Sequence, residues 1–271
     1  DTKAAGATMA VQLNHAGRKA STGCFSIGFE HESVPEEQGG WKTVGPSANA
    51  FGSLTKPRAL TVDEIHAIVD QFRDAAWRAY DIGFDAVEIH AAHGYLLSQF
   101  LDPLINERED EYGGSFKNRI RMLVEVVDAV RSVVPDTMPV LVRVSATDWA
   151  AGGWDLDQTV DLAKVLKEHG VDLMDVSTGG MIPGVTIPVK PDYQVPFAEQ
   201  VRSRAEIPTT AVGLITKPKQ AKKILKSGAA DAIEIGRAAL RDPNWPLRAA
   251  HKLGIPTEDA PYQPQYVRGA Y

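Results

Sequence analysis

The run His90-Ala91-Ala92-His93-Gly94-Tyr95 places three side chains that can hold or move a proton in one short stretch. Two imidazoles three positions apart at a strand end can bind a metal, act as a base, or donate a pair of hydrogen bonds to one oxygen. A zinc site needs a third protein ligand, and no cysteine lies nearby to supply one. Two N–H donors directed at an anionic or carbonyl oxygen, with Tyr95 as a proton donor, fit these residues better.

A second group of residues suits an anion. The last two expected strands end in Ala211-Val212-Gly213 and Ile235-Gly236-Arg237. Loops after strands 7 and 8 of α/β barrels often hold a phosphate, because glycine lets the backbone approach and the following helix presents N–H groups. Arg237 adds a planar, two-pronged donor. Tight turns are the alternative explanation for both glycines.

The elements that position these residues follow a repeating pattern of polar helix, glycine and short strand rich in Val, Ile and Ala. Glycine suits the end of a helix because it tolerates the left-handed conformation. The glycines in question are Gly6, Gly83, Gly170 and Gly228. Strands are expected at residues 8–13, 84–90, 139–145, 171–176, 208–213 and 230–235. Helix starts are expected at Thr61, Ser115, Asp155 and Thr216. Strands that alternate with helices predict a parallel α/β domain.

Alternation along the strands separates an apolar face from a polar one. Helices cover the outside of a barrel, so the polar face is expected to point inward. Four polar residues lie near the carboxyl ends of their strands, where barrel active sites are built: Gln12, His90, Arg143 and Ser177. The alternative for each of them is a satisfied structural hydrogen-bond network.

The phosphate pattern falls on the last two of six expected strands, which identifies them as strands 7 and 8 of a (β/α)8 TIM barrel. The strand at 8–13 is then number 3, and two β/α units are expected upstream of Asp1. The length of 271 residues equals one barrel only because the loop from Gly17 to Pro57 is long. We expect that loop to cover the active site. We also expect a single domain, residues 1–271, with 254–271 as an irregular C-terminal arm.

Composition restricts the partners. Twenty-nine Lys and Arg against 35 Asp and Glu give a net charge of −6, which disfavours nucleic acid. No apolar run is long enough to span a membrane. Cys24, the single cysteine, cannot form an internal disulfide. A reducing, cytoplasmic location is therefore expected.

Five runs occur in order across nearly the whole chain. They are Val11-Gln12-Leu13-Asn14-His15-Ala16-Gly17-Arg18-Lys19, Pro46-Ser47-Ala48, Glu88-Ile89-His90-Ala91-Ala92-His93-Gly94-Tyr95-Leu96, Asp110-Glu111-Tyr112-Gly113-Gly114-Ser115 and Ile235-Gly236-Arg237. Together they resemble the Old Yellow Enzyme family of flavin-dependent ene-reductases. The His-x-x-His form and the tail Gln265-Tyr266-Val267-Arg268-Gly269 most resemble the thermophilic-like branch of that family.

The resemblance implies an FMN-dependent NAD(P)H oxidoreductase, with NADPH or NADH as the hydride donor. Gln12 would hydrogen-bond the pyrimidine edge of the FMN ring. Arg143 would lie beside the N1 and C2 carbonyl region and stabilise the reduced flavin. Gly213, Gly236 and Arg237 would hold the FMN phosphate.

The same resemblance implies how the substrate is handled. His90 and His93 would bind the carbonyl oxygen of an α,β-unsaturated compound, so that the N5 hydride can add to the β-carbon. Tyr95 would protonate the α-carbon. Arg268 would reach a neighbouring subunit's site in a homodimer or homotetramer, with Tyr266 beside it. A solvated charge at a flexible terminus is the alternative for Arg268.

Some features of the family have no counterpart here. Members of the branch carry flavin contacts on the first two strands, including a cysteine that tunes the flavin and a tyrosine that contacts substrate. Cys24 lies in the loop after strand 3 and does not correspond to that cysteine.

Two other functions stay open from the sequence. A phosphate-binding barrel lyase would need an inward-facing lysine for a Schiff base, whereas Lys164, Lys167, Lys190 and Lys217 are expected on helices or loops. A truncated, non-catalytic barrel that serves as a structural or interaction subunit is the other hypothesis.

Overall fold

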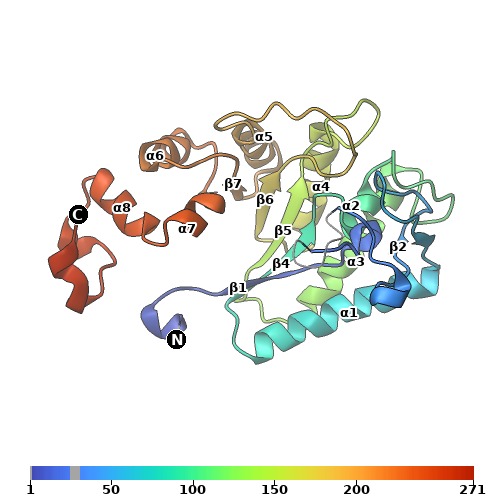
Figure 1. The fold of residues 1–271 in the computed structure, drawn as a ribbon, viewed down its shortest axis with the longest axis horizontal. Helices are drawn as coiled ribbons and strands as arrows, with labels where there is room; N and C mark the ends of the chain where they lie inside the picture. The colour runs from blue at the N-terminus through green and yellow to red at the C-terminus, as the bar shows by residue number, and fades with distance from the viewer. Residues whose placement is uncertain (1, 25–30) are drawn as a thin grey trace.

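A six-stranded, all-parallel sheet forms the centre of the molecule, in the order β1-β4-β5-β6-β7-β8 (Figure 1). The computed structural model describes residues 2–24 and 31–271. The strands are β1 (Ala10–Leu13), β4 (Ala86–Ala91), β5 (Val140–Ser145), β6 (Leu173–Ser177), β7 (Thr209–Ala211) and β8 (Ala232–Ile233). Each lies within or overlaps one of the six expected strands. In the described residues β1 and β8 are the two edges of an open sheet, so the fold here is part of a barrel.

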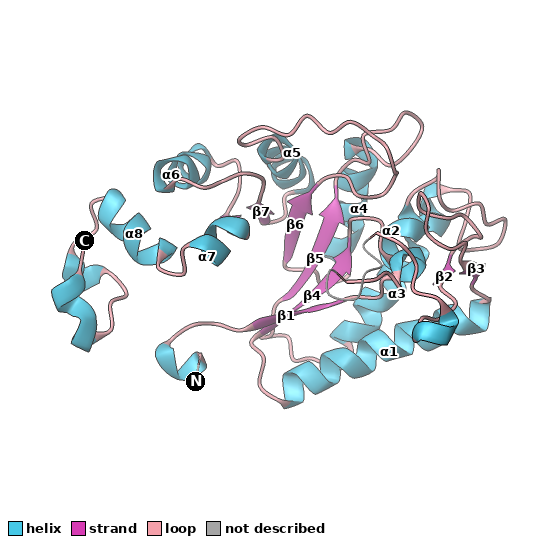
Figure 2. Ribbon diagram, in the orientation of Figure 1, coloured by secondary structure: helices cyan, strands magenta, loops and turns pink. Residues whose placement is uncertain are grey.

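The helices are α1 (Val62–Asp81), α2 (Leu96–Leu101), α3 (Phe116–Arg131), α4 (Leu156–Glu168), α5 (Val195–Ala205), α6 (Pro218–Ser227), α7 (Arg237–Arg241) and α8 (Trp245–Lys252). Helices α1, α3, α4 and α5 form a layer over one face of the sheet, whereas α7 and α8 lie beyond β7, to the side of it (Figure 2). Val87 and Ile89 of β4 and Val142 of β5 are fully buried among the helices of that layer. The apolar half of each strand pattern therefore packs against helices, which leaves the polar half on the opposite face.

The expected helix boundaries are largely confirmed. Gly6, Gly83, Gly170 and Gly228 all have φ between 75° and 90°. Thr61 forms a capping box with Glu64. The side chains of Ser115 and Asp155 cap α3 and α4. Thr216 is not the cap of α6, which begins after Lys217. The side-chain oxygen of Gln220 accepts from the backbone N–H groups of Thr216 and Lys217, at 3.1 and 3.3 Å, which ties the start of α6 to the segment before it.

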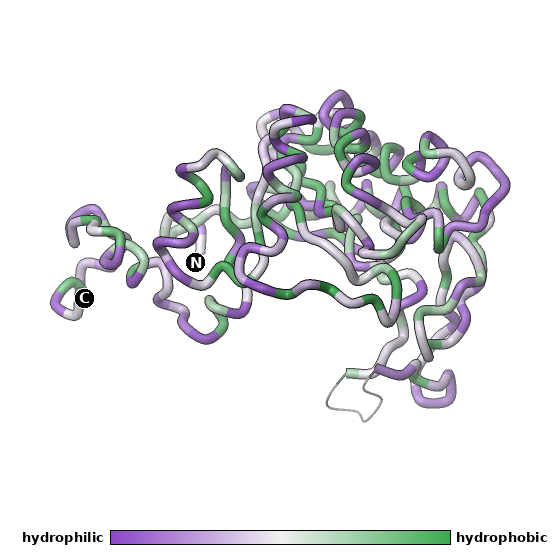
Figure 3. Tube along the Cα trace, turned by 90° about the horizontal axis from the view of Figure 1, so that it is seen from above, coloured by the Kyte–Doolittle hydropathy of each residue, from purple (hydrophilic) through white to green (hydrophobic). Residues whose placement is uncertain are grey.

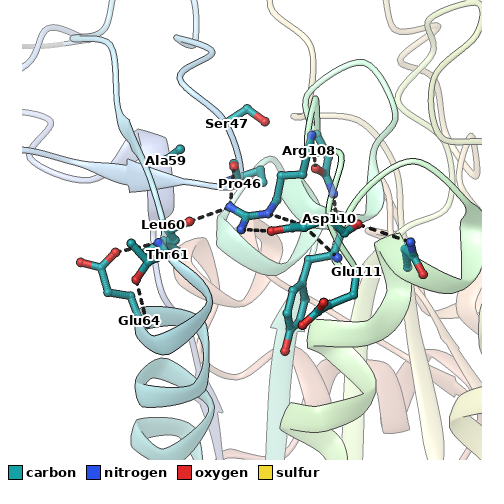
Figure 4. Close-up of polar contacts among 12 residues, drawn as sticks. Pro46, Ser47, Ala59, Leu60, Thr61, Glu64, Arg108, Asp110 and Glu111 are labelled. Atoms are coloured by element: carbon teal, nitrogen blue, oxygen red, sulfur yellow. Dashed lines mark hydrogen bonds and ion pairs between the residues drawn. The ribbon is translucent and has the colours of Figure 1, made fainter.

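The long loop after β1 carries short elements of its own. These are η2 (Gly17–Lys19), η3 (Glu36–Gln38) and the parallel pair β2 (Val44–Gly45) and β3 (Arg58–Ala59). Arg108, which follows α2, connects to this loop through hydrogen bonds. Its guanidinium donates to the carbonyls of Pro46 and Leu60, at 3.0 and 2.6 Å (Figure 4). The same group pairs with both carboxylate oxygens of Asp110. Residues 25–30 of this expected cover lie outside the described part of the chain.

The two chain ends carry 3-10 turns. η1 (Lys3–Ala5) is held by a 2.7 Å ion pair between Lys3 and Asp85. The segment expected as an irregular arm contains η4 (Thr257–Asp259) and η5 (Pro264–Gly269), and it lies at the end of the molecule remote from β4 and α1 (Figure 1). Helical turns alternate between hydrophilic and hydrophobic along the trace, as one-sided packing requires (Figure 3). None of the described helices has the length and apolar character that crossing a bilayer demands.

We expect Arg108→Lys to lower the free energy of unfolding by about 2 kcal/mol, because an ammonium has three donors and cannot make the four hydrogen bonds of this guanidinium. Arg58→Lys is the matched control: Arg58 forms a 2.7 Å ion pair with Glu64 in which both side chains are exposed, so little change is expected. Urea unfolding followed by circular dichroism measures both. Equal, small effects of the two substitutions would contradict the anchoring role of Arg108.

Candidate active site

His90, His93 and Tyr95 meet where β4 ends. His90 is the fifth residue of β4, and Tyr95 is the N-cap residue of α2. The ring centroids of His90 and His93 are 5.1 Å apart, and those of His90 and Tyr95 are 5.2 Å apart. His90 is only 4% exposed, and its Nδ1 has no hydrogen-bond partner. A buried polar atom without a partner is costly unless something else supplies one, so the cluster suits a ligand.

His93 is fixed at three points. Its backbone has φ of 57°, in the left-handed region that a residue with a side chain rarely occupies. The backbone N–H of His93 donates to Ser145 Oγ at 2.9 Å, and its carbonyl accepts from Lys19 Nζ at 2.7 Å. The ring Nε2 lies 2.9 Å from Ser177 Oγ. The ring is therefore oriented before any ligand arrives.

Two glycines allow the turn after β4 to approach the loop after β6. A Cβ on Gly94 would lie 2.4 Å from the carbonyl oxygen of Gly180, and a Cβ on Gly180 would lie 2.8 Å from His93 Cα. Both glycines also have positive φ. Lys19 Nζ closes this junction by donating to the Gly180 carbonyl at 2.5 Å, and it lies 3.9 Å from the ring centroid of Phe51.

The electrostatic environment keeps both imidazoles neutral. Burial, followed by the charge of Arg143, lowers the pKa of His90 to about 4. Burial, followed by the charges of Arg143, His90 and Lys19, lowers the pKa of His93 to about 3. Burial also lowers the pKa of Lys19, to about 8. Near neutral pH each imidazole therefore carries one N–H and one bare nitrogen.

Arg143 lies level with His90 in the register between β4 and β5 and faces a group of carboxylates. Its Nε is 2.9 Å from Asp175 and its Nη2 is 3.5 Å from Glu234. One oxygen from each of Glu88, Asp175 and Glu234 lies within 4.8 Å of the others. Burial raises the pKa of Glu88 and of Asp175, and the charge of Glu234 adds to it.

Gln12 of β1 stands beside this carboxylate group. Its Nε2 donates to Glu88 Oε2 at 2.5 Å, and the two residues are level in the register between β1 and β4. The amide oxygen of Gln12 can then accept a hydrogen bond, and the second N–H of its Nε2 can donate one.

Gly213, Gly236 and Arg237 surround one hollow of about 200 Å³ at the ends of β7 and β8. Gly213 has φ of 120°, and a Cβ placed on Gly236 would meet no atom within 4 Å. The backbone from Gly213 to Thr216 lines one side, and Arg237 and Arg241 supply positive charge. Backbone and guanidinium groups around an open space of this size suit a phosphate.

Arg268 is the one expected site residue placed apart from the rest. It lies on η5, in the C-terminal segment remote from the end of β4 (Figure 1).

Sequence reasoning assigned no role to Lys19 or Asp175. The period-2 pattern of Leu173-Met174-Asp175-Val176-Ser177 puts Asp175 on the face of Ser177, so its inward position could have been found. Lys19 comes from a 3-10 turn in a loop, and no periodicity in the sequence indicated that its ammonium returns to His93.

Comparison with known proteins identifies relatives over most of the chain. Residues 1–255 match the model of the NADH:flavin oxidoreductase / NADH oxidase family. An NADPH dehydrogenase of Geobacillus thermodenitrificans (strain NG80-2) is 47% identical over 265 residues, which are 97% of this chain and 71% of that protein.

Solved structures agree. A 2-naphthoyl-CoA reductase has a TM-score of 0.80 at 26% identity, and the match covers 95% of this chain but only 40% of that one. An old yellow enzyme homologue from Zymomonas mobilis has a TM-score of 0.74 at 29% identity, covering 92% of this chain and 68% of that one. These neighbours confirm the expected α/β barrel class, of which the described residues form a six-stranded part.

We expect His90 and His93 to stay neutral at about pH 5.5, where an imidazole in water is mostly charged. Unfolded histidines titrate near 6.5, so the unfolded chain binds more protons than the folded one below that pH. The contribution of these two residues to stability is therefore fully present above about pH 6.5. It is lost as the pH falls toward their lowered pKa values in the folded chain. A 15N NMR titration of histidine-labelled protein checks this. Protonation of both rings near pH 6.5 would contradict the electrostatic account.

Proposed function

The chain belongs to the NADH:flavin oxidoreductase / NADH oxidase family, and from this premise we propose that it reduces activated C=C bonds of α,β-unsaturated carbonyl compounds. Family membership makes it an FMN-dependent oxidoreductase that works with NAD(P)H. The resemblance to the Old Yellow Enzyme family is thereby confirmed. The observation that carries the proposal is the pair of neutral, oriented imidazoles at the end of β4, with Tyr95 beside them.

The residues present fit FMN. The hollow between the ends of β7 and β8 offers glycine backbone and Arg237 to a phosphate. On the polar face of the sheet, Arg143 of β5 lies between the histidines and that hollow, and Gln12 lies on the edge strand β1, on the other side of β4. Both side chains suit the polar edge of a flavin ring. Glu234 also borders the hollow, but its carboxylate accepts from Thr210 Oγ1 at 2.9 Å and faces Arg143. Its charge is therefore compensated within the protein.

Bound FMN supplies the hydride, which it receives from NAD(P)H. Gly213, Gly236 and Arg237 would hold its phosphate. Gln12 would bind the pyrimidine edge through its amide oxygen and the second N–H of Nε2, because only one of the two N–H groups donates to Glu88. Arg143, held at Nε by Asp175, would place a fixed positive charge where negative charge accumulates on reduction.

His90 and His93 would hold the substrate's carbonyl oxygen with one N–H each. A carbonyl oxygen that gains negative charge during reduction is stabilised by donors already in place, and these cost no reorganisation at the moment of reaction. Because the imidazoles are neutral, they polarise the carbonyl without giving up a proton to it.

Tyr95 would hold the proton that is delivered to the α-carbon. The ring centroid of Tyr95 lies 5.2 Å from the ring centroid of His90 and 5.7 Å from Lys19 Nζ. The tyrosine is thus on the same side of the site as the carbonyl donors, as addition across one double bond requires.

A lyase using a Schiff base is disfavoured by the placement of Lys19. Its ammonium lies in the site, but it donates to the carbonyls of His93 and Gly180 and serves as a structural clamp. Arg268 and Tyr266 on the C-terminal segment would complete the site of a neighbouring subunit in a homodimer or homotetramer. A cytoplasmic location remains a prediction.

The test is to purify the full-length protein, reconstitute it with FMN and record its spectrum. We expect a yellow protein whose flavin absorbance bleaches anaerobically on addition of NADPH and returns on addition of 2-cyclohexenone. A colourless full-length protein that takes up no FMN would overturn the proposal. So would bound flavin that bleaches with NADPH but is never reoxidised by an enone.

The same preparation tests the assigned roles. His90→Ala with His93→Ala removes both carbonyl donors, so the affinity for 4-hydroxybenzaldehyde should fall at least about tenfold while FMN is retained. Equal loss of phenol and FMN binding would contradict the division between substrate and cofactor residues.

A further inference from the structure

The hydroxyl of Ser177 has two partners and a single proton to donate. Its Oγ lies 2.9 Å from His93 Nε2 and 3.0 Å from the carbonyl oxygen of Val144. If Ser177 donates to Val144, the imidazole must be the donor in the hydrogen bond between His93 and Ser177, and the proton of His93 is on Nε2. If it donates to His93, the proton of the imidazole sits on Nδ1.

These two arrangements differ in what His93 offers a ligand. In both of them Nε2 is occupied by Ser177, so Nδ1 is the nitrogen available to the site. A bare Nδ1 would present a lone pair to an incoming oxygen and repel it. A protonated Nδ1 would donate to that oxygen. Because His93 is neutral, only one of its two ring nitrogens, Nδ1 or Nε2, carries a proton.

The surroundings favour donation from Ser177 to the ring. Val144 lies within β5, where the parallel ladder with β6 supplies backbone N–H donors, so its carbonyl does not depend on the hydroxyl of Ser177. Ser177 is 2% exposed, which leaves water little access as an alternative partner of the hydroxyl. The backbone of His93, held by Ser145 and Lys19, keeps the ring within reach of Ser177.

We propose that Ser177 is a positioning residue that donates to His93 Nε2 and thereby holds the proton of the imidazole on Nδ1, as a donor toward the substrate oxygen. This inference rests on the proposed function, in which His93 binds a carbonyl. It assigns the hydroxyl a role in specificity: a ligand atom that is itself a donor is rejected at this position, and an acceptor is bound.

The experiment measures the tautomer directly. Long-range 1H–15N correlation spectra distinguish Nδ1–H from Nε2–H imidazoles, and seven histidines are few enough to assign through the loss of signals in His93→Ala. We expect Nδ1–H for His93 in the FMN-loaded wild-type chain, with and without 4-hydroxybenzaldehyde. An Nε2–H signal in wild type would overturn the proposal without any variant at Ser177.

Three variants complete the test. Ser177→Ala should shift His93 toward Nε2–H and weaken phenol binding about tenfold or more, with FMN retained. Ser177→Thr keeps the hydroxyl and should restore the Nδ1–H signal. Ser145→Ala is the matched control, because Ser145 is the register partner of Ser177 but contacts only the backbone of His93. In this variant the tautomer of His93 should stay that of wild type.

The outcomes separate the two claims. A wild-type chain that binds no phenol contradicts the proposed function. A wild-type chain that binds phenol while Ser177→Ala leaves both tautomer and affinity unchanged contradicts only the role of Ser177. An equal tautomer shift in Ser145→Ala would show that general loosening of the turn, and not the hydroxyl of Ser177, controls the ring.

Discussion

The site depends on His93 being held in a backbone conformation that it would not choose. A left-handed residue with a side chain costs roughly 1 to 3 kcal/mol, and the surrounding structure must offset that cost. Here Ser145 at the end of β5, Ser177 at the end of β6 and Lys19 of η2 each contact a different part of the residue. The donor geometry therefore exists only when neighbouring parallel strands fold in register.

Charge on the inner face of the sheet follows from the same constraint. Arg143 lies level with His90 on β4 and with Asp175 on β6. Burial lowers the pKa of both imidazoles, and the charge of this guanidinium lowers it further, while its Nε pairs with the buried carboxylate of Asp175. The result is a rim with neutral donors at one end, a compensated cation in the middle and a cationic hollow at the ends of β7 and β8. In the proposed function these groups would hold the substrate carbonyl, the polar edge of the flavin ring and the FMN phosphate, in that order.

Much of this arrangement could be predicted from short-range patterns. Glycine after four helical segments located four of the six strands, because few other residues tolerate positive φ there. Alternation put Gln12, His90, Arg143 and Ser177 on one face. What depends on the path of a loop or on register between strands could not be predicted. Lys19 reaches His93 through a loop. Asp175 of β6 contacts Arg143 only because the register places them side by side on adjacent strands. The N-cap of α6 is Lys217 and not Thr216, because Pro218, which starts the helix, follows Lys217 directly.

The central claim is that two neutral imidazoles, fixed before binding, receive one substrate oxygen. A crystal structure of the FMN-loaded chain with bound 4-hydroxybenzaldehyde tests it most directly. The account predicts the phenolic oxygen within hydrogen-bond distance of one nitrogen of His90 and of Nδ1 of His93, with the backbone of His93 still left-handed. A metal ion between the two rings, or a phenolic oxygen bound elsewhere while the histidines stay apart from it, would contradict the account.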